Sequence, residues 1–282
     1  MAMIKNFDEL TIQDNFLFQY VMQDKELCKH LIERILDIKI ERIEMPVVEK
    51  TIGNGLLSKS IRLDVYVKDN EERVYDIEMQ CTNEGQLLLA KRARYYQSMM
   101  DSELLLKGRS YVELNPSFVI FICTFDPFKY GLPMYTFTHC CKQDNTIKLN
   151  DEATHVFLNA KAAGKAEDAD IAAFLDYVDG NLTDNRFAQQ MDSRVKAIKA
   201  LEPVRRDYML LRDELLKMKK DGIKEGIEEG IEIGKEKGIE IGREKERHEL
   251  TEKYIQIIMK KLNLSYDDAL KFLTEVPEGD TK

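Results

Sequence analysis

The chain has 282 residues, of which 44% are hydrophobic and 33% charged, with a formal net charge of −9. The apolar fraction is enough to bury a core, and the length corresponds to one large domain or two small ones. The acidic excess is spread over the whole chain, which argues against a protein that coats nucleic acid through bulk charge. It does not exclude an enzyme of nucleic acids, because a local basic groove and bound cations can offset acidic ligands.

The cysteines and the N-terminus bear on the cellular compartment. The five cysteines include no CxxC pair, and an odd number fits poorly with a secreted disulfide framework. Buried reduced thiols are the main expectation, with a metal or redox role for Cys140 and Cys141 beside His139 as the alternative. The N-terminal residues have no signal-peptide pattern, and no run approaches the roughly 18 apolar residues that cross a bilayer. We therefore expect a soluble, cytoplasmic protein without a membrane partner.

Two helices are predicted at the start of the chain. Apolar residues recur at helical spacing over residues 14–36, with a break near residues 23–24. The alternating stretch that ends at Pro46 predicts an edge strand, and the glycines in residues 53–55 predict a turn.

The clearest local pattern lies in residues 60–80. Apolar and polar residues alternate on both sides of a short polar run, which predicts a β-hairpin. Pairing Lys68 with Val74 places Asp64 opposite Glu78, and a slip by one residue would bury the carboxylates. The polar residues of the hairpin then share one face, and they are Arg62, Asp64, Asp76, Glu78 and Gln80.

Strands and helices alternate through the remaining chain. A helix is predicted over residues 86–107 with Gly108 as its C-cap. The continuous apolar run at residues 116–125 predicts a strand in the middle of a sheet, covered on both faces. The other predicted elements are strands at 135–139 and 153–158 and helices at 170–178, 249–262 and 269–274. Residues 186–220 are predicted to form either one longer helix or a pair of helices broken at Pro203.

The two opposed carboxylates of the hairpin predict a cation site. Directly opposite side chains have Cβ atoms about 5 Å apart, where like charges repel. A cation between Asp64 and Glu78 relieves that repulsion, and Mg²⁺ favours one or two carboxylates while keeping waters for a phosphate substrate. The alternative is that these side chains form the solvated face of a two-layer sheet.

Several segments together resemble a known family. RLDV at 62–65 followed by YDIEMQ at 75–80 resembles the signature of the PD-(D/E)XK nuclease superfamily. The resemblance is closer to the Rpn family of recombination-promoting nucleases, also described as transposases, and it covers residues 8–160 and the C-terminal repeat. The other segments that carry it are DNFLF at 14–18, KRARYY at 91–96, Tyr111, the apolar strand that begins at Pro116 and the Gly-Ile-Glu repeat.

This resemblance implies an α/β, restriction-endonuclease-like fold. Its core would have the order α-β-β-β-α-β, with a mixed central sheet flanked by helices and an α-helical C-terminal extension. The domain boundaries that we expect are a nuclease-like domain at 1–165, a helical region at 166–220, a repeat helix or tether at 221–248 and a C-terminal helical segment at 249–282.

The resemblance also implies a Mg²⁺-dependent DNA endonuclease in recombination or transposition, with Mn²⁺ as a further ion. Asp64 and Glu78 would be metal ligands, and the carbonyl of Met79 a third. Leu63 replaces the proline of the superfamily pattern. Gln80 stands where most members have the lysine that positions and activates the attacking water, and its amide can still orient a water or contact phosphate.

Basic and acidic residues around the hairpin extend this prediction. The residues expected to bind phosphate or DNA are Arg62, Lys91, Arg92 and Tyr95. The alternative is a solvated helix surface on which one arginine bridges to an acid such as Glu84. Asp14 and Glu33, on the N-terminal helices, are candidates for an additional acidic ligand.

The C-terminal repeat predicts self-association. Glycine recurs every four residues from Gly222 to Gly242, although each helical glycine costs close to 1 kcal/mol relative to alanine. A four-residue period makes the Gly/Ile stripe drift with the hand of a right-supercoiled pair. We expect a helical arm that forms a homodimer or higher homo-oligomer, with a charged, partly frayed tether as the alternative. The alternative function is a catalytically weak nuclease-like module that binds DNA or scaffolds proteins.

Overall fold

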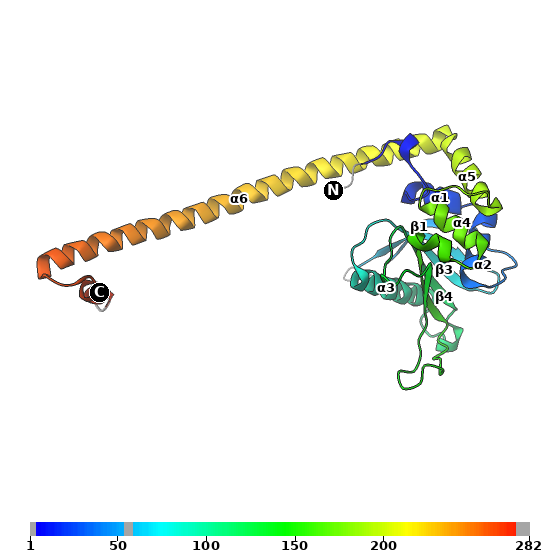
Figure 1. Cartoon of the computed structure of the whole chain (residues 1–282), viewed down its shortest axis with the longest axis horizontal. Helices are drawn as coiled ribbons and strands as arrows, with labels where there is room; N and C mark the ends of the chain where they lie inside the picture. Colours follow the sequence, from blue (N-terminus) through cyan, green and yellow to red (C-terminus); the bar gives the residue numbers. More distant parts are fainter. Residues whose placement is uncertain (1–3, 54–58, 275–282) are drawn as a thin grey trace. The chain divides into compact units, whose positions relative to one another are not determined.

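The computed structural model describes residues 4–53 and 59–274, and the described chain divides into two compact units between Leu211 and Arg212 (Figure 1). The first unit carries the sheet. Its helices are α1 (Asn15–Met22), α2 (Lys25–Leu36), α3 (Gln86–Leu104), α4 (Ala169–Val178) and α5 (Arg186–Lys199), with short 3-10 helices at Phe7–Glu9, Tyr111–Glu113 and Ala160–Lys165. Its strands are β1 (Val47–Ile52), β2 (Ile61–Lys68), β3 (Val74–Gln80), β4 (Ser117–Cys123), β5 (Met134–Phe137) and β6 (Ala153–Asn159).

The six strands form one mixed sheet in the order β1-β2-β3-β4-β6-β5. The pairs β3–β4 and β4–β6 are parallel, while β1–β2, β2–β3 and β5–β6 are antiparallel. The apolar strand β4 lies between β3 and β6, as its continuous hydrophobic run predicts. The α/β class, the mixed central sheet and the α-helical extension are confirmed.

Helices cover both faces of the sheet (Figure 1). The apolar hairpin residues Val65, Tyr75 and Ile77 pack in one core with residues of α1, α2, α4 and α5. A second core places Tyr66 and Phe121 against Leu89 and Met100 of α3. The helix α3 therefore lies on the face opposite to the other helices of this unit.

Next to its turn the hairpin has the register that its alternation predicts, because Tyr66 pairs with Asp76 and Lys68 with Val74. The predicted pairing of Asp64 with Glu78 is not part of the ladder, whose last pair is Val65 with Ile77. Asp69 organises the turn and is nearly buried, with an exposed fraction of 2%. Its carboxylate accepts hydrogen bonds from the backbone amide of Arg73 (3.0 Å) and the hydroxyl of Tyr75 (2.7 Å), among others.

Two local predictions are wrong. The edge strand begins at Val47, after Pro46, and only a bridge between Ile43 and Asp69 remains of the strand predicted before it. Proline has no N–H to donate, so it precedes the ladder. Gly108 is not the C-cap of α3, because Leu105 takes that position with extended backbone and Gly108 lies in the following turn. The turn predicted at residues 53–55 falls mostly outside the described residues.

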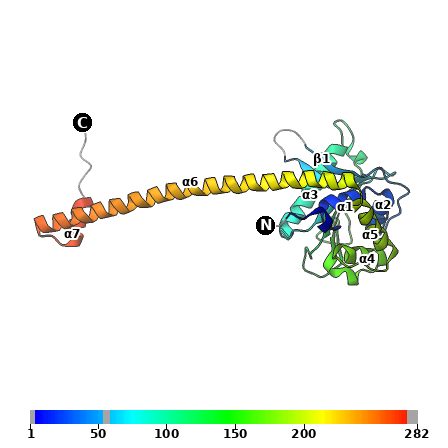
Figure 2. The same cartoon turned by 90° about the horizontal axis from the view of Figure 1, so that it is seen from above.

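The glycine repeat belongs to one long helix, α6 (Glu202–Leu262), which both views draw without interruption (Figures 1 and 2). It joins segments that the sequence predicts as separate helices. Of the two alternatives for residues 186–220, the structure shows the pair of helices, since α5 ends at Lys199 and Pro203 lies in the first turn of α6, where its missing N–H is not needed. A short helix, α7 (Tyr266–Thr274), follows, capped by Ser265. No helix within the described ranges is long and apolar enough to cross a membrane.

We predict that Asp69→Ala destabilises the first unit by about 3 kcal/mol, because the buried hydroxyl of Tyr75 and the part-buried donors of Glu71 and Arg73 lose their acceptor at once. Urea denaturation followed by far-UV circular dichroism would measure the loss. Glu71→Ala is the matched control: it lies in the same turn, its side chain is mostly exposed, and its ion pair with Arg73 is a surface pair. Equal stability of the two variants would show that Asp69 does not organise the turn.

Candidate active site

The candidate active site lies where β2 and β3 separate. The ladder pairs of the hairpin extend to Val65 and Ile77. Beyond that point Asp64 of β2 meets Glu78 of β3 through side chains: the amide of Asp64 donates to Oε1 of Glu78 at 2.8 Å. The two carboxylates are buried, with exposed fractions of 8% and 3%. The interpretation of this face as a solvated surface is therefore wrong.

Asp64 is held by α1 as well as by β3. Its carboxylate accepts from the side-chain amides of Asn15 (3.2 Å) and Gln19 (3.3 Å) and from the backbone amide of Met79 (3.2 Å). Burial raises the pKa of Asp64 above its ordinary value, while the hydrogen bonds from Met79 and Gln19 oppose that rise. The carboxylate is thus desolvated and fixed in direction.

Glu78 lies between Asp64 and Arg92. Its Oε2 accepts from Nη2 of Arg92 at 2.9 Å, so both oxygens of this carboxylate are engaged. Burial, and next the charge of Asp64, raise the pKa of Glu78 to about 7 despite the hydrogen bonds from Asp64 and Arg92. A carboxylate in this range changes its charge with small changes of pH or of bound cations.

Asp76 is a third acid on this face of β3. It is fully buried, and within the described chain neither of its carboxylate oxygens accepts a hydrogen bond. Burial, followed by the charges of Glu78 and Asp64, raises its pKa well above the usual range. Asp76 is therefore a desolvated acid beside the metal-binding candidates Asp64 and Glu78.

Arg92 joins Gln80 to Glu78. Its Nη1 donates to Oε1 of Gln80 at 2.8 Å, and Nε2 of Gln80 donates to the carbonyl of Thr82 at 2.5 Å. Arg92 also lies 3.8 Å from Glu84, so the predicted bridge to this acid exists beside the shorter contact with Glu78. The structure thus brings Asp64, Glu78, Gln80 and Arg92 together.

The other predicted DNA-binding residues lie nearer the surface. Lys91 is exposed on α3, and Tyr95 donates through its hydroxyl to the carbonyl of Lys59 at 2.6 Å. Arg62 is largely exposed and lies 3.7 Å from Glu49. These contacts leave the charges of Lys91 and Arg62 at the surface of the hairpin and α3.

The two additional acidic candidates have structural partners elsewhere. Asp14 stands at the N-cap of α1, where it accepts from Lys5 and from the backbone amide of Thr11. Glu33 accepts from the backbone amide of Ile40. Neither of these hydrogen bonds involves Asp64 or Glu78.

The residues that sequence reasoning missed are Asn15 and Gln19. They lie four positions apart in a helix that is otherwise mostly apolar, which places them on one face of α1. Gln19 is buried, with an exposed fraction of 7%. Two carboxamides at this spacing in a buried helix could have indicated these residues from the sequence, because a buried polar group requires a hydrogen-bond partner.

The donors fit a hard divalent cation. Mg²⁺ prefers oxygen ligands and uses one or two carboxylates, which Asp64, Glu78 and the carbonyl of Met79 can supply. No group of three or more His, Cys, Asp or Glu side chains in the described ranges is arranged to hold a metal ion.

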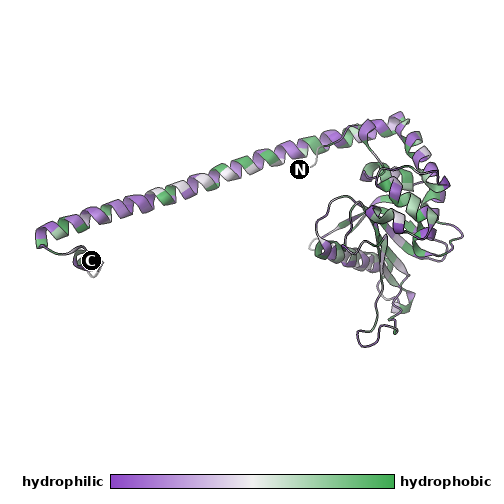
Figure 3. Cartoon of the chain, in the orientation of Figure 1, coloured by the Kyte–Doolittle hydropathy of each residue, from purple (hydrophilic) through white to green (hydrophobic). Residues whose placement is uncertain are grey.

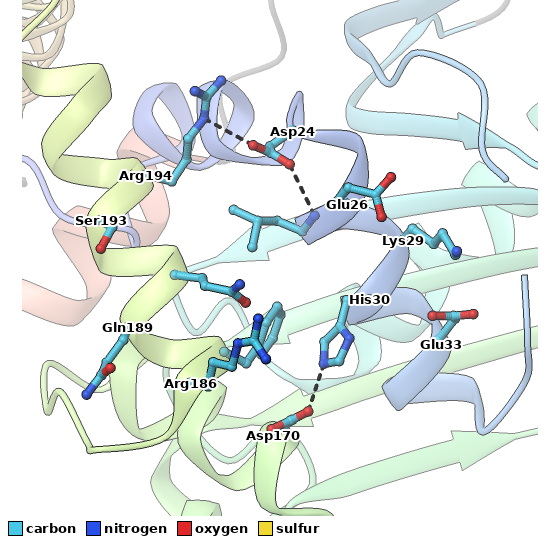
Figure 4. Close-up of a pocket in the computed structure, with 13 residues that line it drawn as sticks. Asp24, Glu26, Lys29, His30, Glu33, Asp170, Arg186, Gln189, Ser193 and Arg194 are labelled. Carbon is cyan, nitrogen blue, oxygen red and sulfur yellow. Dashed lines mark hydrogen bonds and ion pairs between the residues drawn. The ribbon is translucent and has the colours of Figure 1, made fainter.

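A separate groove of about 970 Å³ lies between α2, α4 and α5 (Figure 4). His30 and Asp170 are hydrogen-bonded across it at 2.7 Å, and Arg186 and Glu33 are among the residues that line it. Of the predicted site residues, Glu33 lines this groove. This groove is therefore distinct from the acidic cluster of the hairpin.

A mixed sheet flanked by helices, with buried acids where its hairpin opens, defines a restriction-endonuclease-like protein. Over residues 15–222 the chain matches the model of the PD-(D/E)XK nuclease family transposases, and it belongs to that family. This membership supports a nuclease or transposition-related role, for which DNA is the implied substrate. No curated protein and no solved structure matches the chain.

We predict that Glu78 makes the stability of the metal-free protein fall as pH rises. The folded state binds the proton of Glu78 more tightly than the unfolded chain, whose pKa is near 4.5, so stability is lost as pH rises toward 7. Between about pH 5 and pH 8, the free energy of unfolding of the wild type should fall by roughly 3 kcal/mol at most relative to that of Glu78→Gln.

Urea unfolding in the presence of a chelator would measure this difference at each pH. Glu71→Gln, an exposed carboxylate on the same hairpin, should keep the pH dependence of the wild type. Parallel pH profiles for the wild type and Glu78→Gln would contradict a raised pKa for Glu78.

Proposed function

We propose that the protein is a Mg²⁺-dependent DNA endonuclease of the Rpn type, which hydrolyses phosphodiester bonds in recombination or transposition. One observation carries the proposal: two buried carboxylates from paired strands converge where the hairpin opens, and each accepts a backbone amide of the other strand. Acids that are desolvated and fixed in this way are suited to binding a cation rather than water.

In this function Asp64, Glu78 and the carbonyl of Met79 hold the ion. A bound Mg²⁺, or Mn²⁺ in its place, lowers the pKa of water and polarises a phosphoryl oxygen. Gln80 orients the water or the phosphate through its amide. The DNA backbone contacts Arg62, Lys91, Arg92 and Tyr95, which surround the acids on the hairpin and α3.

We predict that Asp64→Ala and Glu78→Ala each lower metal-dependent nicking of plasmid DNA by about 100-fold or more. The reason is that each variant removes a carboxylate that binds the ion. Asp170→Asn, in the separate groove, is the control and should cut at the wild-type rate. Undiminished nicking by both alanine variants would refute the assignment.

A weak or inactive nuclease-like module is the second candidate, and the neutral side chain at position 80 favours it. Cation binding separates the two. For an enzyme of the proposed type, Mg²⁺ or Mn²⁺ should raise the melting temperature of the DNA-free protein, and Asp64→Asn should abolish the shift. A melting temperature that neither ion raises, together with absent nicking, would favour the module.

We also propose that the arm formed by α6 pairs with a second copy of the chain. Its isoleucines alternate with charged residues along the helix (Figure 3). Ile223, Ile227 and Ile231 are each more than half exposed, and an added Cβ at Gly226 or Gly230 would meet no atom within 4 Å. An apolar stripe with small residues of this kind allows close approach of a partner helix.

We predict opposite effects of alanine on the helix and on the oligomer. In an isolated helix, replacing Gly226, Gly230 and Gly234 by alanine stabilises by about 1 kcal/mol per site. In a closely packed pair the added methyl groups keep the helices apart. The oligomer of the triple variant should therefore be weaker and dissociate at protein concentrations at which the wild type is still associated. Light scattering of the full chain would measure its mass. Alanine at Glu229, Glu236 and Glu240 is the matched control, and equal masses of all three proteins would contradict packing through the glycines.

A further inference from the structure

We propose that Arg92 positions the two motif side chains of β3 and supplies the positive charge that glutamine at position 80 lacks. The name of the family describes a motif with lysine two residues after the second acid, and this chain has Gln80 there. The guanidinium of Arg92 binds that glutamine and the acid Glu78 at the same time. The inference deepens the nuclease function proposed above and rests on it.

The contacts divide between the two terminal nitrogens of one planar group. Nη2 lies 2.9 Å from Oε2 of Glu78, and Nη1 lies 2.8 Å from Oε1 of Gln80. A guanidinium presents its donors in a rigid fork, so fixing one nitrogen also fixes the other. Lysine has a single ammonium on a flexible stem and cannot hold both side chains in one fixed relation.

The arginine itself is held by the core beneath α3. Its guanidinium carbon lies 5.0 Å from the ring centre of Phe121 and 5.3 Å from that of Tyr96. The side chain is 27% exposed, in contrast to the neighbouring exposed Lys91. Ala93, the next residue of α3, is buried and anchors the helix there. Arg92 is therefore a fixed group under the site and not a mobile surface charge.

Gln80 depends on this arrangement for its orientation. Its oxygen accepts from Arg92, and one N–H donates to the carbonyl of Thr82, which leaves one N–H for another acceptor. The glutamine brings no charge to three neighbouring acids, Asp64, Asp76 and Glu78. Among the residues that the structure describes, Arg92 is the basic side chain in an ion pair with Glu78.

The two residues thus share one task. Gln80 presents a directed amide, and Arg92 holds Glu78 in place while adding a positive charge next to the reacting phosphate. Each carboxylate oxygen has two lone pairs, so Oε2 of Glu78 has the capacity to accept from Arg92 and to bind an ion. The role requires the arginine during turnover as well as in the folded resting state.

Plasmid cleavage by the full chain tests this shared role. The variants are the single changes Arg92→Met, Arg92→Lys and Gln80→Lys, and the double change that combines Gln80→Lys with Arg92→Met. We expect Arg92→Met to lower kcat by about 100-fold with little change in KM for DNA, and Arg92→Lys to recover little of it. The double variant should have a kcat at least about tenfold higher than that of Arg92→Met, because Gln80→Lys places an ammonium at the motif position. A loss confined to KM, or a double variant no faster than Arg92→Met, would overturn the proposal.

A second measurement tests, without any cleavage assay, whether Arg92 orients the side chain of Gln80. The side-chain amide signals of Gln80, assigned by their absence from Gln80→Lys, are followed by NMR in the DNA-free protein. They should shift in Arg92→Met and stay unchanged in Arg94→Met, which removes an exposed arginine of the same helix. Unchanged signals in Arg92→Met would overturn the positioning role, whereas a wild type that cuts no DNA while the signals shift would count against the nuclease function alone.

Discussion

The site depends on a reciprocal exchange of hydrogen bonds at the open end of the hairpin. The amide of Asp64 on β2 donates to the carboxylate of Glu78, and the amide of Met79 on β3 donates to the carboxylate of Asp64. Side chains take over the pairing where the backbone ladder stops at Val65 and Ile77. The strands separate without leaving these amides unsatisfied, and both acids turn toward the opening.

Burying acids is costly, and the surrounding elements offset that cost. Asn15 and Gln19 bring neutral donors from α1, and Arg92 brings a cation from α3. Desolvation still outweighs these partners, because the pKa values of Asp64 and Glu78 remain raised. In the metal-free site the negative charge of these carboxylates is therefore unfavourable, and protonation or a bound cation would compensate it.

Alternation along the sequence was sufficient to predict the hairpin and its register next to the turn, because the period of a strand is two. It did not predict that the ladder ends at Val65 and Ile77, or that Leu63 packs in the core with α3 while Met79 packs in the core with α1 and α2. The place of β4 in the middle of the sheet followed from its continuous apolar run. The contacts of Arg92 and Gln19 could not be predicted, since they depend on the rotation of α3 and α1 about their axes against the sheet. The burial of Asp76 and Glu78 depends likewise on α3 covering a face that alternation alone leaves open.

The parallel pairing of β3 with β4 has a consequence for biosynthesis. Asp64, Glu78, Gln80 and Arg92 all precede β4 in the chain, yet β3 acquires its second neighbour only when Ser117–Cys123 has been made. Until then the growing polypeptide carries Glu78 and Gln80 on a strand with one free edge. Because Phe121 of β4 lies 5.0 Å from the guanidinium carbon of Arg92, the surroundings of the centre are complete only after this non-local contact has formed.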